Sequence, residues 1–215
     1  MEADNNKQKI IETALAMFNE RGCRGVTMDD IAQALRMSKR TLYETFDGKE
    51  ELLTACLTLV QERTNERHRQ AHKQVDEPLL VAMYMLRTNA LFIHKYHRLI
   101  EETERYYPEI HDRFFKIRTE GLREKMQYGM DYVRNHGYLR SDADVDIAID
   151  FFCNLIQQKR ITKVPDREEY VHRINEMCFT YLRGLMTTDS LIRYDKEANH
   201  FADVVRKLDD ERSIK

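Results

Sequence analysis

The spacing of apolar residues along the chain predicts a protein built from helices. Apolar side chains recur at steps of three and four residues, which is the period of one buried face of an α-helix. The first such run spans residues 10–18 and stops at Gly22, a residue type that commonly ends helices. Further runs cover residues 50–60, 79–93, 110–133, 148–156 and 168–187. The spacing is helical rather than alternating, so we expect an all-α fold.

Two short helices are predicted to follow the first one and to meet across a tight turn. Thr27 can cap one of them, with Asp30 at the reciprocal position three residues later. Ser38 can cap the other, which runs to about Thr45. A fourth helix then begins, with Asp47 as its cap and Glu50 at the reciprocal position. Two short helices joined by a turn of this kind form a helix-turn-helix, whose second helix enters the major groove of DNA.

The second short helix is expected to present polar groups outward. Leu42 and Phe46 lie four residues apart, so they share the face that docks on the preceding helices. The other faces carry two cations, a hydroxyl and a phenol: Lys39, Arg40, Thr41 and Tyr43. Such groups suit phosphate oxygens and base edges, and a guanidinium has the shape to bind guanine O6 and N7.

The segment VTMDDIAQALRMSKRTLYETFDGKEELL resembles the DNA-binding segment of the tetracycline-repressor (TetR) family. The resemblance extends over about residues 8–60. Family features that recur here in order are Thr27, Ile31–Ala32, Ser38–Tyr43, Phe46 and Lys49–Leu52. It implies a sequence-specific transcriptional regulator that binds double-stranded DNA at a palindromic operator as a homodimer.

The resemblance also implies a division into domains and a set of DNA-binding residues. We expect a helix-turn-helix domain over residues 1–50, a connecting helix over about 48–70, and a helical regulatory and dimerisation domain over 71–215. The residues expected to contact DNA are Thr27, Arg36, Ser38, Lys39, Arg40, Thr41, Tyr43 and Lys49.

One position departs from the family pattern. The family has Gly followed by Val in the turn before the recognition helix, whereas this chain has Arg36 followed by Met37. We therefore expect a residue with a Cβ at positive φ, at a cost of about 1 kcal/mol. A contact between Arg36 and a DNA phosphate would offset this cost.

The chain beyond Gln74 has no motif of comparable specificity. One helix is predicted to start at Pro78, and another to follow the break at residues 106–108. Their Met and aromatic side chains can either fill an ordinary core or line an adaptable apolar cavity. The candidate ligand-binding residues are Met83, Phe92, Phe114, Gly121, Met126, Tyr128 and Met130.

Two functions remain open for this larger part. In the first, an apolar or amphipathic small-molecule effector releases a repressor from its operator. In the second, the regulator has no small-molecule ligand and is constitutive or controlled by a protein partner. Residues 148–156 and 168–187 are apolar around much of their circumference, which favours a helical interface with a second copy, as the resemblance also implies. Residues 201–208 predict a last amphipathic helix that packs on its own subunit.

Charge and cysteine content narrow these possibilities. The formal net charge is −2, and residues 1–74 hold 12 Lys and Arg against 12 Asp and Glu, so DNA affinity depends on where the cations lie. The four cysteines are scattered without a CxxC pair, which favours buried thiols in the reducing cytoplasm. No apolar stretch reaches the roughly 18 to 20 residues that cross a bilayer, so no membrane contact is expected.

Catalytic chemistry has little support in the sequence. It contains no Gly-rich phosphate loop, no nucleophile elbow and no HExxH spacing, so we predict no enzyme, no catalytic residue and no cofactor. His94, His97 and Glu101 could share one helix face as metal ligands. Because no second His-rich helix complements them, we predict no metal site.

Overall fold

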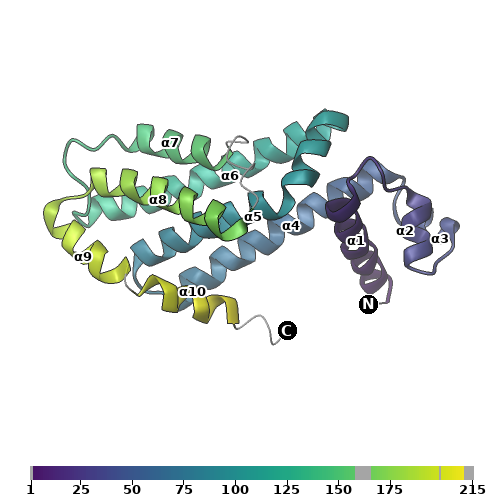
Figure 1. The fold of residues 1–215 in the computed structure, drawn as a ribbon, viewed down its shortest axis with the longest axis horizontal. Helices are drawn as coiled ribbons and strands as arrows, with labels where there is room; N and C mark the ends of the chain where they lie inside the picture. Colours follow the sequence, from purple (N-terminus) through teal and green to yellow (C-terminus); the bar gives the residue numbers. More distant parts are fainter. Residues whose placement is uncertain (1, 158–165, 199, 211–215) are drawn as a thin grey trace. The chain divides into compact units, whose positions relative to one another are not determined.

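A computed structural model of the chain describes residues 2–157, 166–198 and 200–210, and these residues form ten α-helices (Figure 1). Their only extended pairing is an isolated bridge between Leu139 and Met186. The prediction of an all-α fold is confirmed. The helices are α1 Glu2–Arg21, α2 Met28–Ala34, α3 Lys39–Thr45, α4 Lys49–Gln74, α5 Pro78–Tyr106, α6 Pro108–Asn135, α7 Val145–Gln157, α8 Arg167–Leu185, α9 Thr188–Ala198 and α10 Phe201–Asp210.

The described residues divide into two compact units. The first unit lies within Met1–Arg63 and Tyr96–Arg118, and the second within Thr64–Lys95 and Thr119–Lys215. The first therefore contains α1, α2 and α3 whole, and the second contains α7 to α10 whole. Helices α4, α5 and α6 each contribute a segment to both units. The sequence-based domain boundary near residue 70 stays a prediction.

In the first unit, α1 ends at a glycine that the geometry requires. The N–H of Gly22 donates to the Phe18 carbonyl at 3.0 Å, and its φ of 85° lies in the left-handed region that favours glycine. A Cβ at this position would lie only 2.1 Å from Oε1 of Glu102. The predicted end of the first helix is thus confirmed, and two separate constraints disfavour a side chain there.

The N-terminus of α2 is fixed by a reciprocal cap. The Thr27 hydroxyl accepts the Asp30 N–H, and the Asp30 carboxylate accepts the Thr27 N–H at 2.8 Å. The carboxylate also accepts the Thr27 hydroxyl at 2.7 Å, and these hydrogen bonds hold the pKa of Asp30 below its usual range. The predicted capping role of Thr27 is confirmed.

The turn between α2 and α3 has the strained residue that the sequence led us to expect. Arg36 has φ 54°, and its N–H donates to Gln33, while the Met37 N–H donates to Ala32. These two bonds form the Schellman motif, in which glycine usually takes the left-handed position. On the far side of the turn, Ser38 caps α3 as predicted by accepting the Thr41 N–H at 3.1 Å.

The start of α4 differs from the prediction by one residue. Because the helix begins at Lys49, its third residue is Glu51, and Glu51 accepts the Asp47 N–H at 2.7 Å. The prediction of Glu50 as the reciprocal partner was therefore wrong. The side chain of Asp47 is exposed.

Helices α5 and α6 each have a segment in both units. The backbone of α5 leaves helical geometry at Tyr96, which produces a kink, and α6 stops before Gly137, whose φ is 73°. The last helix, α10, packs on α4 and α5 through Leu208, which shares a buried cluster with Ala71 and Tyr84. The predicted packing of the C-terminal helix on its own subunit is confirmed. Within the described ranges, none of the helices has both the length and the apolar character that crossing a membrane requires.

Candidate functional site

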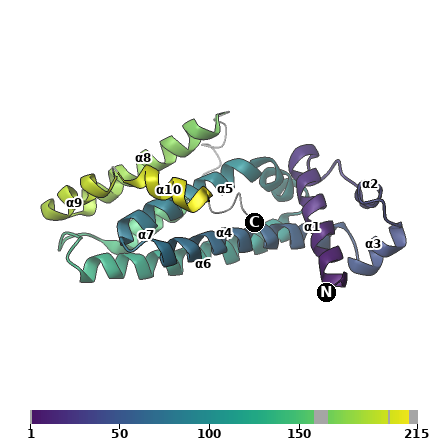
Figure 2. The same ribbon diagram turned by 90° about the horizontal axis from the view of Figure 1, so that it is seen from below.

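Helix α3 is held by its apolar face and exposes its polar one. Leu42 and Phe46 are 0% and 1% exposed, and α2 and α3 lie side by side in both views (Figures 1 and 2). The Arg40 side chain is 88% exposed, and Lys39 and Tyr43 are also exposed. The outward polar cluster expected from helical spacing is therefore present. Whether these groups bind DNA stays a prediction.

Two carboxylates that sequence reasoning did not assign lie against the cations of α3. The Lys39 ammonium forms an ion pair with Asp29 of α2, and Nε of Arg40 donates to Oε1 of Glu44 at 2.8 Å. All four side chains are more than half exposed. Exposed pairs of this kind are worth about 0.2–1 kcal/mol or less, so phosphates or bases can compete for the cations.

The predicted DNA-binding residues divide by environment. Thr27, Arg36 and Ser38 are exposed, and the Ser38 and Thr41 hydroxyls are 2.8 Å apart. Lys49 is half-buried, and its ammonium donates to the Arg24 carbonyl at 3.4 Å. Burial lowers the pKa of Lys49. Its ammonium thus already has a contact inside the first unit.

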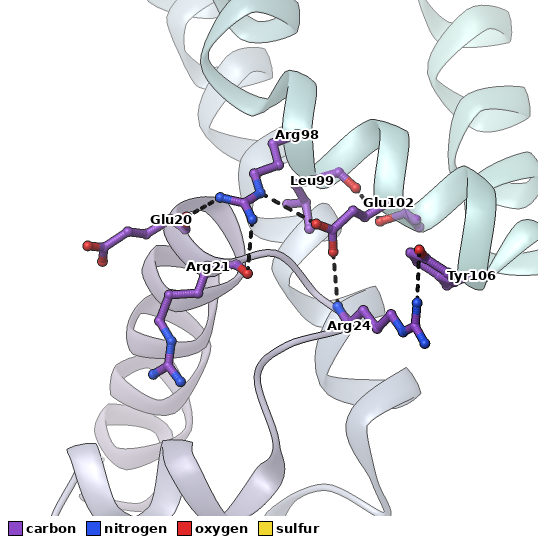
Figure 3. A network of polar contacts seen from close by, with 8 residues as sticks. Glu20, Arg21, Arg24, Arg98, Leu99, Glu102 and Tyr106 are labelled. Atoms are coloured by element: carbon purple, nitrogen blue, oxygen red, sulfur yellow. Dashed lines mark hydrogen bonds and ion pairs between the residues drawn. The ribbon is translucent and has the colours of Figure 1, made fainter.

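A polar network ties the C-terminal part of α5 to the end of α1, entirely within the first unit (Figure 3). The Arg98 guanidinium donates to the carbonyls of Glu20 at 2.6 Å and Arg21 at 3.3 Å. Its Nε also donates to Glu102 at 3.4 Å, and Glu102 accepts the Arg24 N–H at 3.0 Å. A cation that binds the last carbonyls of a helix also interacts favourably with the helix dipole. The network therefore fixes the end of α1 against α5.

The sequence carries no signal for this network because most of its partners are backbone groups. Arg98 and Glu102 are spaced as an ordinary exposed helix pair, four residues apart. The cysteine beside them is buried, and its burial next to the Glu102 carboxylate raises the pKa of Cys23 to about 11. All four cysteines are free and buried, which confirms the expectation of buried thiols.

The second unit contains an apolar cavity of about 340 Å³. Three of the candidate ligand-binding residues line it: Met126, Tyr128 and Met130. Most other lining residues are apolar, and His72, Asp76, Asn89 and Lys125 add polar groups. The full lining consists of His72, Val75, Asp76, Val81, Ala82, Met85, Leu86, Asn89, Leu122, Lys125, Met126, Tyr128, Gly129, Met130, Tyr132, Val133, Phe152 and Leu182.

Four candidate ligand-binding residues are not part of that lining. Met83 and Phe92 are 2% and 4% exposed and belong to the core. Phe114 lies in the first unit, and a Cβ on Gly121 would meet no atom within 4 Å. Helical spacing identifies which side chains share a face, but the gap between neighbouring helices depends on tertiary packing. Periodicity alone therefore could not identify Ala82 and Leu86 of α5 as residues that line the cavity.

The spacing of the two histidines considered as metal ligands is interrupted by the kink in α5. Tyr96, with φ −110° and ψ 17°, stands between His94 and His97. The His94 ring instead lies 5.4 Å from the ring of Tyr170. In the described ranges, no group of three or more His, Cys, Asp and Glu side chains could hold a metal ion.

Apolar side chains remain exposed on both helices expected at the interface with a second copy. Ile147 of α7 is 60% exposed, and Met177 of α8 is 45% exposed. Between these helices, the rings of Phe151 and Tyr181 stack with centroids 4.0 Å apart. The surface therefore has apolar area that a second subunit could bury.

The chain is similar to known regulators in sequence. Residues 10–56 match the family model described as bacterial regulatory proteins, tetR family. The HTH-type transcriptional repressor KstR2 of Mycobacterium tuberculosis is 27% identical over 155 residues, which cover 70% of this chain and 77% of KstR2. The biofilm operon HTH-type negative transcriptional regulator IcaR of Staphylococcus epidermidis is 44% identical over 46 residues, which cover 21% of this chain and 25% of IcaR.

Solved structures share the fold. The ketosteroid transcriptional regulator KstR2 of Mycobacterium tuberculosis aligns with a TM-score of 0.61 at 20% identity, covering 85% of this chain and 95% of KstR2. A TetR family regulator from Cytophaga hutchinsonii aligns with a TM-score of 0.69 at 16% identity, covering 87% of this chain and 98% of that regulator. AibR in complex with isovaleryl coenzyme A and operator DNA aligns with a TM-score of 0.58 at 20% identity, covering 80% of this chain and 97% of AibR.

Proposed function

Because the chain is a DNA-binding transcriptional regulator of the tetR family, we propose that it acts as a homodimeric repressor that an apolar or amphipathic small molecule releases from a palindromic operator. One observation carries the DNA-binding part of the proposal. The short helix α3 is fixed at both ends and along its apolar face, and its cations and the Tyr43 phenol are exposed. A DNA-bound regulator of this kind works in the cytoplasm.

The DNA-contacting groups have distinct roles in this proposal. Arg40 reads guanine through O6 and N7, which gives sequence specificity. Tyr43, Thr41 and Lys39 bind phosphates, which position the protein without reading bases. Backbone N–H groups at the starts of α2 and α3, the helices that Thr27 and Ser38 cap, also bind phosphates. Arg36 and Lys49 complete the phosphate contacts, Lys49 after leaving the Arg24 carbonyl.

A homodimer follows from the size of the reading surface. One seven-residue helix contacts too few base pairs for useful specificity, so two copies read two half-sites. Helices α7 and α8 would form the interface, where Ile147 and Met177 become buried. Light scattering at micromolar concentration should show a dimer, and a monomer would contradict this part of the proposal.

The cavity of the second unit is the proposed effector site. Its volume of about 340 Å³ falls within the range typical of small-molecule sites, and its wall is mainly apolar. Support for a small-molecule ligand, though not for its position or its effect on DNA binding, comes from AibR, whose structure is a complex with isovaleryl coenzyme A and operator DNA. Helix α5 lines the cavity with Ala82, Met85 and Asn89. The same helix carries Arg98 and Glu102, which bind backbone groups at and after the end of α1. In this proposal, the ligand displaces the part of α5 that lines the cavity and so weakens DNA binding.

The DNA-binding part can be tested on duplexes selected from a random library by the purified protein. Arg40→Ala should relax discrimination at one base position per half-site by about 1–3 kcal/mol. Tyr43→Phe should instead weaken binding to selected and random duplexes by the same factor, because it removes a phosphate contact. Equal losses on both duplexes for Arg40→Ala would contradict the role given to Arg40.

A further inference from the structure

We propose that Glu44 is a positioning residue for base recognition, which holds the Arg40 guanidinium in the orientation that binds guanine. The inference rests on the proposed function, because it assumes that α3 reads the major groove. Nothing in the helix-turn-helix pattern assigns a role to Glu44. It lies four residues after Arg40 and is exposed on the same side of α3.

The atom that binds Glu44 is the reason for this role. Nε of Arg40 donates to Oε1 of Glu44 at 2.8 Å. A bidentate contact with guanine O6 and N7 needs two N–H groups of the guanidinium fork. Because the pair with Glu44 uses Nε, the two terminal nitrogens, Nη1 and Nη2, remain for the base. Glu44 thus restrains the side chain without occupying the nitrogens that read guanine.

Restraint matters because Arg40 has little else to fix it. Its side chain is 88% exposed, and arginine has one of the largest rotamer entropies of any side chain. Ordering a free side chain at the moment of binding costs conformational entropy and reduces affinity, whereas a side chain that is oriented beforehand loses little entropy on binding. Lys39 is held differently, by Asp29 of the preceding helix, and its ammonium lacks a planar fork. Only Arg40 among the exposed cations of α3 combines a fork with a restraint from its own helix.

The negative charge of Glu44 gives the proposal a distinctive signature. A carboxylate on the DNA-facing helix repels phosphates, so its removal should strengthen binding to random duplexes or leave it unchanged. Its removal should at the same time weaken discrimination at the base read by Arg40. A merely structural role would lower binding to all duplexes together. The two effects therefore have opposite signs only if Glu44 orients Arg40.

The test compares a selected operator with the same operator carrying A·T in place of the G·C pair that Arg40 reads. Glu44→Ala should lower the ratio of the two affinities about 1.4- to 5-fold, less than the roughly 5- to 150-fold loss expected for Arg40→Ala. Glu44→Gln should restore most of the ratio, because an amide oxygen can still accept from Nε. The double variant Arg40→Ala/Glu44→Ala should show the same ratio as Arg40→Ala alone.

Glu12→Ala provides the matched control. It removes one exposed carboxylate from the same unit, but that carboxylate pairs with Arg63 of α4 rather than with α3. It should leave the ratio unchanged. The inference about Glu44 fails if Glu44→Ala changes both affinities by one factor, or if the double variant loses more discrimination than Arg40→Ala. If Arg40→Ala itself leaves discrimination intact, the proposed role of Arg40 has failed instead.

Discussion

The two units of this protein present their functional groups by different physical means. In the first, the helix ends are individually fixed: a left-handed glycine follows α1, a reciprocal cap precedes α2, and a Schellman turn precedes α3. In the second, α6 also ends at a left-handed glycine, Gly137, and side chains cap the starts of α7, α8 and α9, but here the helices in addition surround a cavity. The first unit should therefore be sensitive to single backbone positions. The second should be sensitive in addition to the volume of the side chains around its cavity.

The largest expected effect comes from the glycine that ends α1. Gly22→Ala places a Cβ in the left-handed region and 2.1 Å from Oε1 of Glu102. The backbone cost and the displaced hydrogen bond of Glu102 should together lower the free energy of unfolding by about 2–3 kcal/mol. Urea unfolding monitored by circular dichroism would measure this loss.

The matched substitution in the second unit should act in the opposite direction. Gly121 lies inside α6, and a Cβ there meets no atom within 4 Å. Gly121→Ala should therefore stabilise the protein by up to about 1 kcal/mol through helix propensity. Equal losses for the two alanine variants would contradict this dependence on backbone conformation and local space.

The second effect concerns the volume of the cavity. Ala82 lines it and Gly121 does not, so Ala82→Leu should fill part of the space whereas Gly121→Leu should not. An effector found in a compound library should lower operator affinity about 5- to 150-fold for the unmodified protein. Ala82→Leu should remove this response and keep DNA binding without effector. Measured by fluorescence anisotropy, a response that survives Ala82→Leu but is lost in Gly121→Leu would place the ligand elsewhere.

A smaller effect is expected at the strained turn before α3. Arg36→Gly relieves a φ of 54° but adds backbone freedom to the unfolded chain. The net result should be a gain in unfolding free energy of about 0.5–1 kcal/mol. DNA affinity should fall at the same time and should depend less steeply on salt, since a phosphate contact is lost. A stability gain with unchanged DNA binding would remove Arg36 from the DNA-contacting set.

Local signals explain why the first unit could be predicted in detail. Caps, helix stops and the turn at Arg36 depend on residues within about five positions of one another, so the sequence displays them directly. Glu51 took the reciprocal position expected for Glu50 because the helix starts one residue later. Arg98 contacts two backbone carbonyls at the end of α1 that lie 78 and 77 positions earlier in the chain. Because the contact is long-range and its acceptors are backbone groups, no local sequence pattern indicates it.

The cavity shows the limit of periodicity in the second unit. Spacing identified the face of α6 that carries Met126 and Met130, and both line the cavity. Met83 and Phe92 are the same kinds of residue, yet they are buried in the core outside that lining. Which apolar face meets a gap depends on how side chains from several helices fill the space between them. Residue type alone therefore cannot separate a ligand wall from a core.

The account depends most directly on the contact between α3 and guanine in the major groove. Methylation of guanine N7 on a selected operator, followed by binding and separation of free and bound duplexes, measures that contact. The expected result is interference at one guanine in each half-site, related by two-fold symmetry, which disappears for Arg40→Ala. Interference that is absent, or that persists unchanged in Arg40→Ala, would contradict the assignment of α3 as the helix that reads DNA through Arg40.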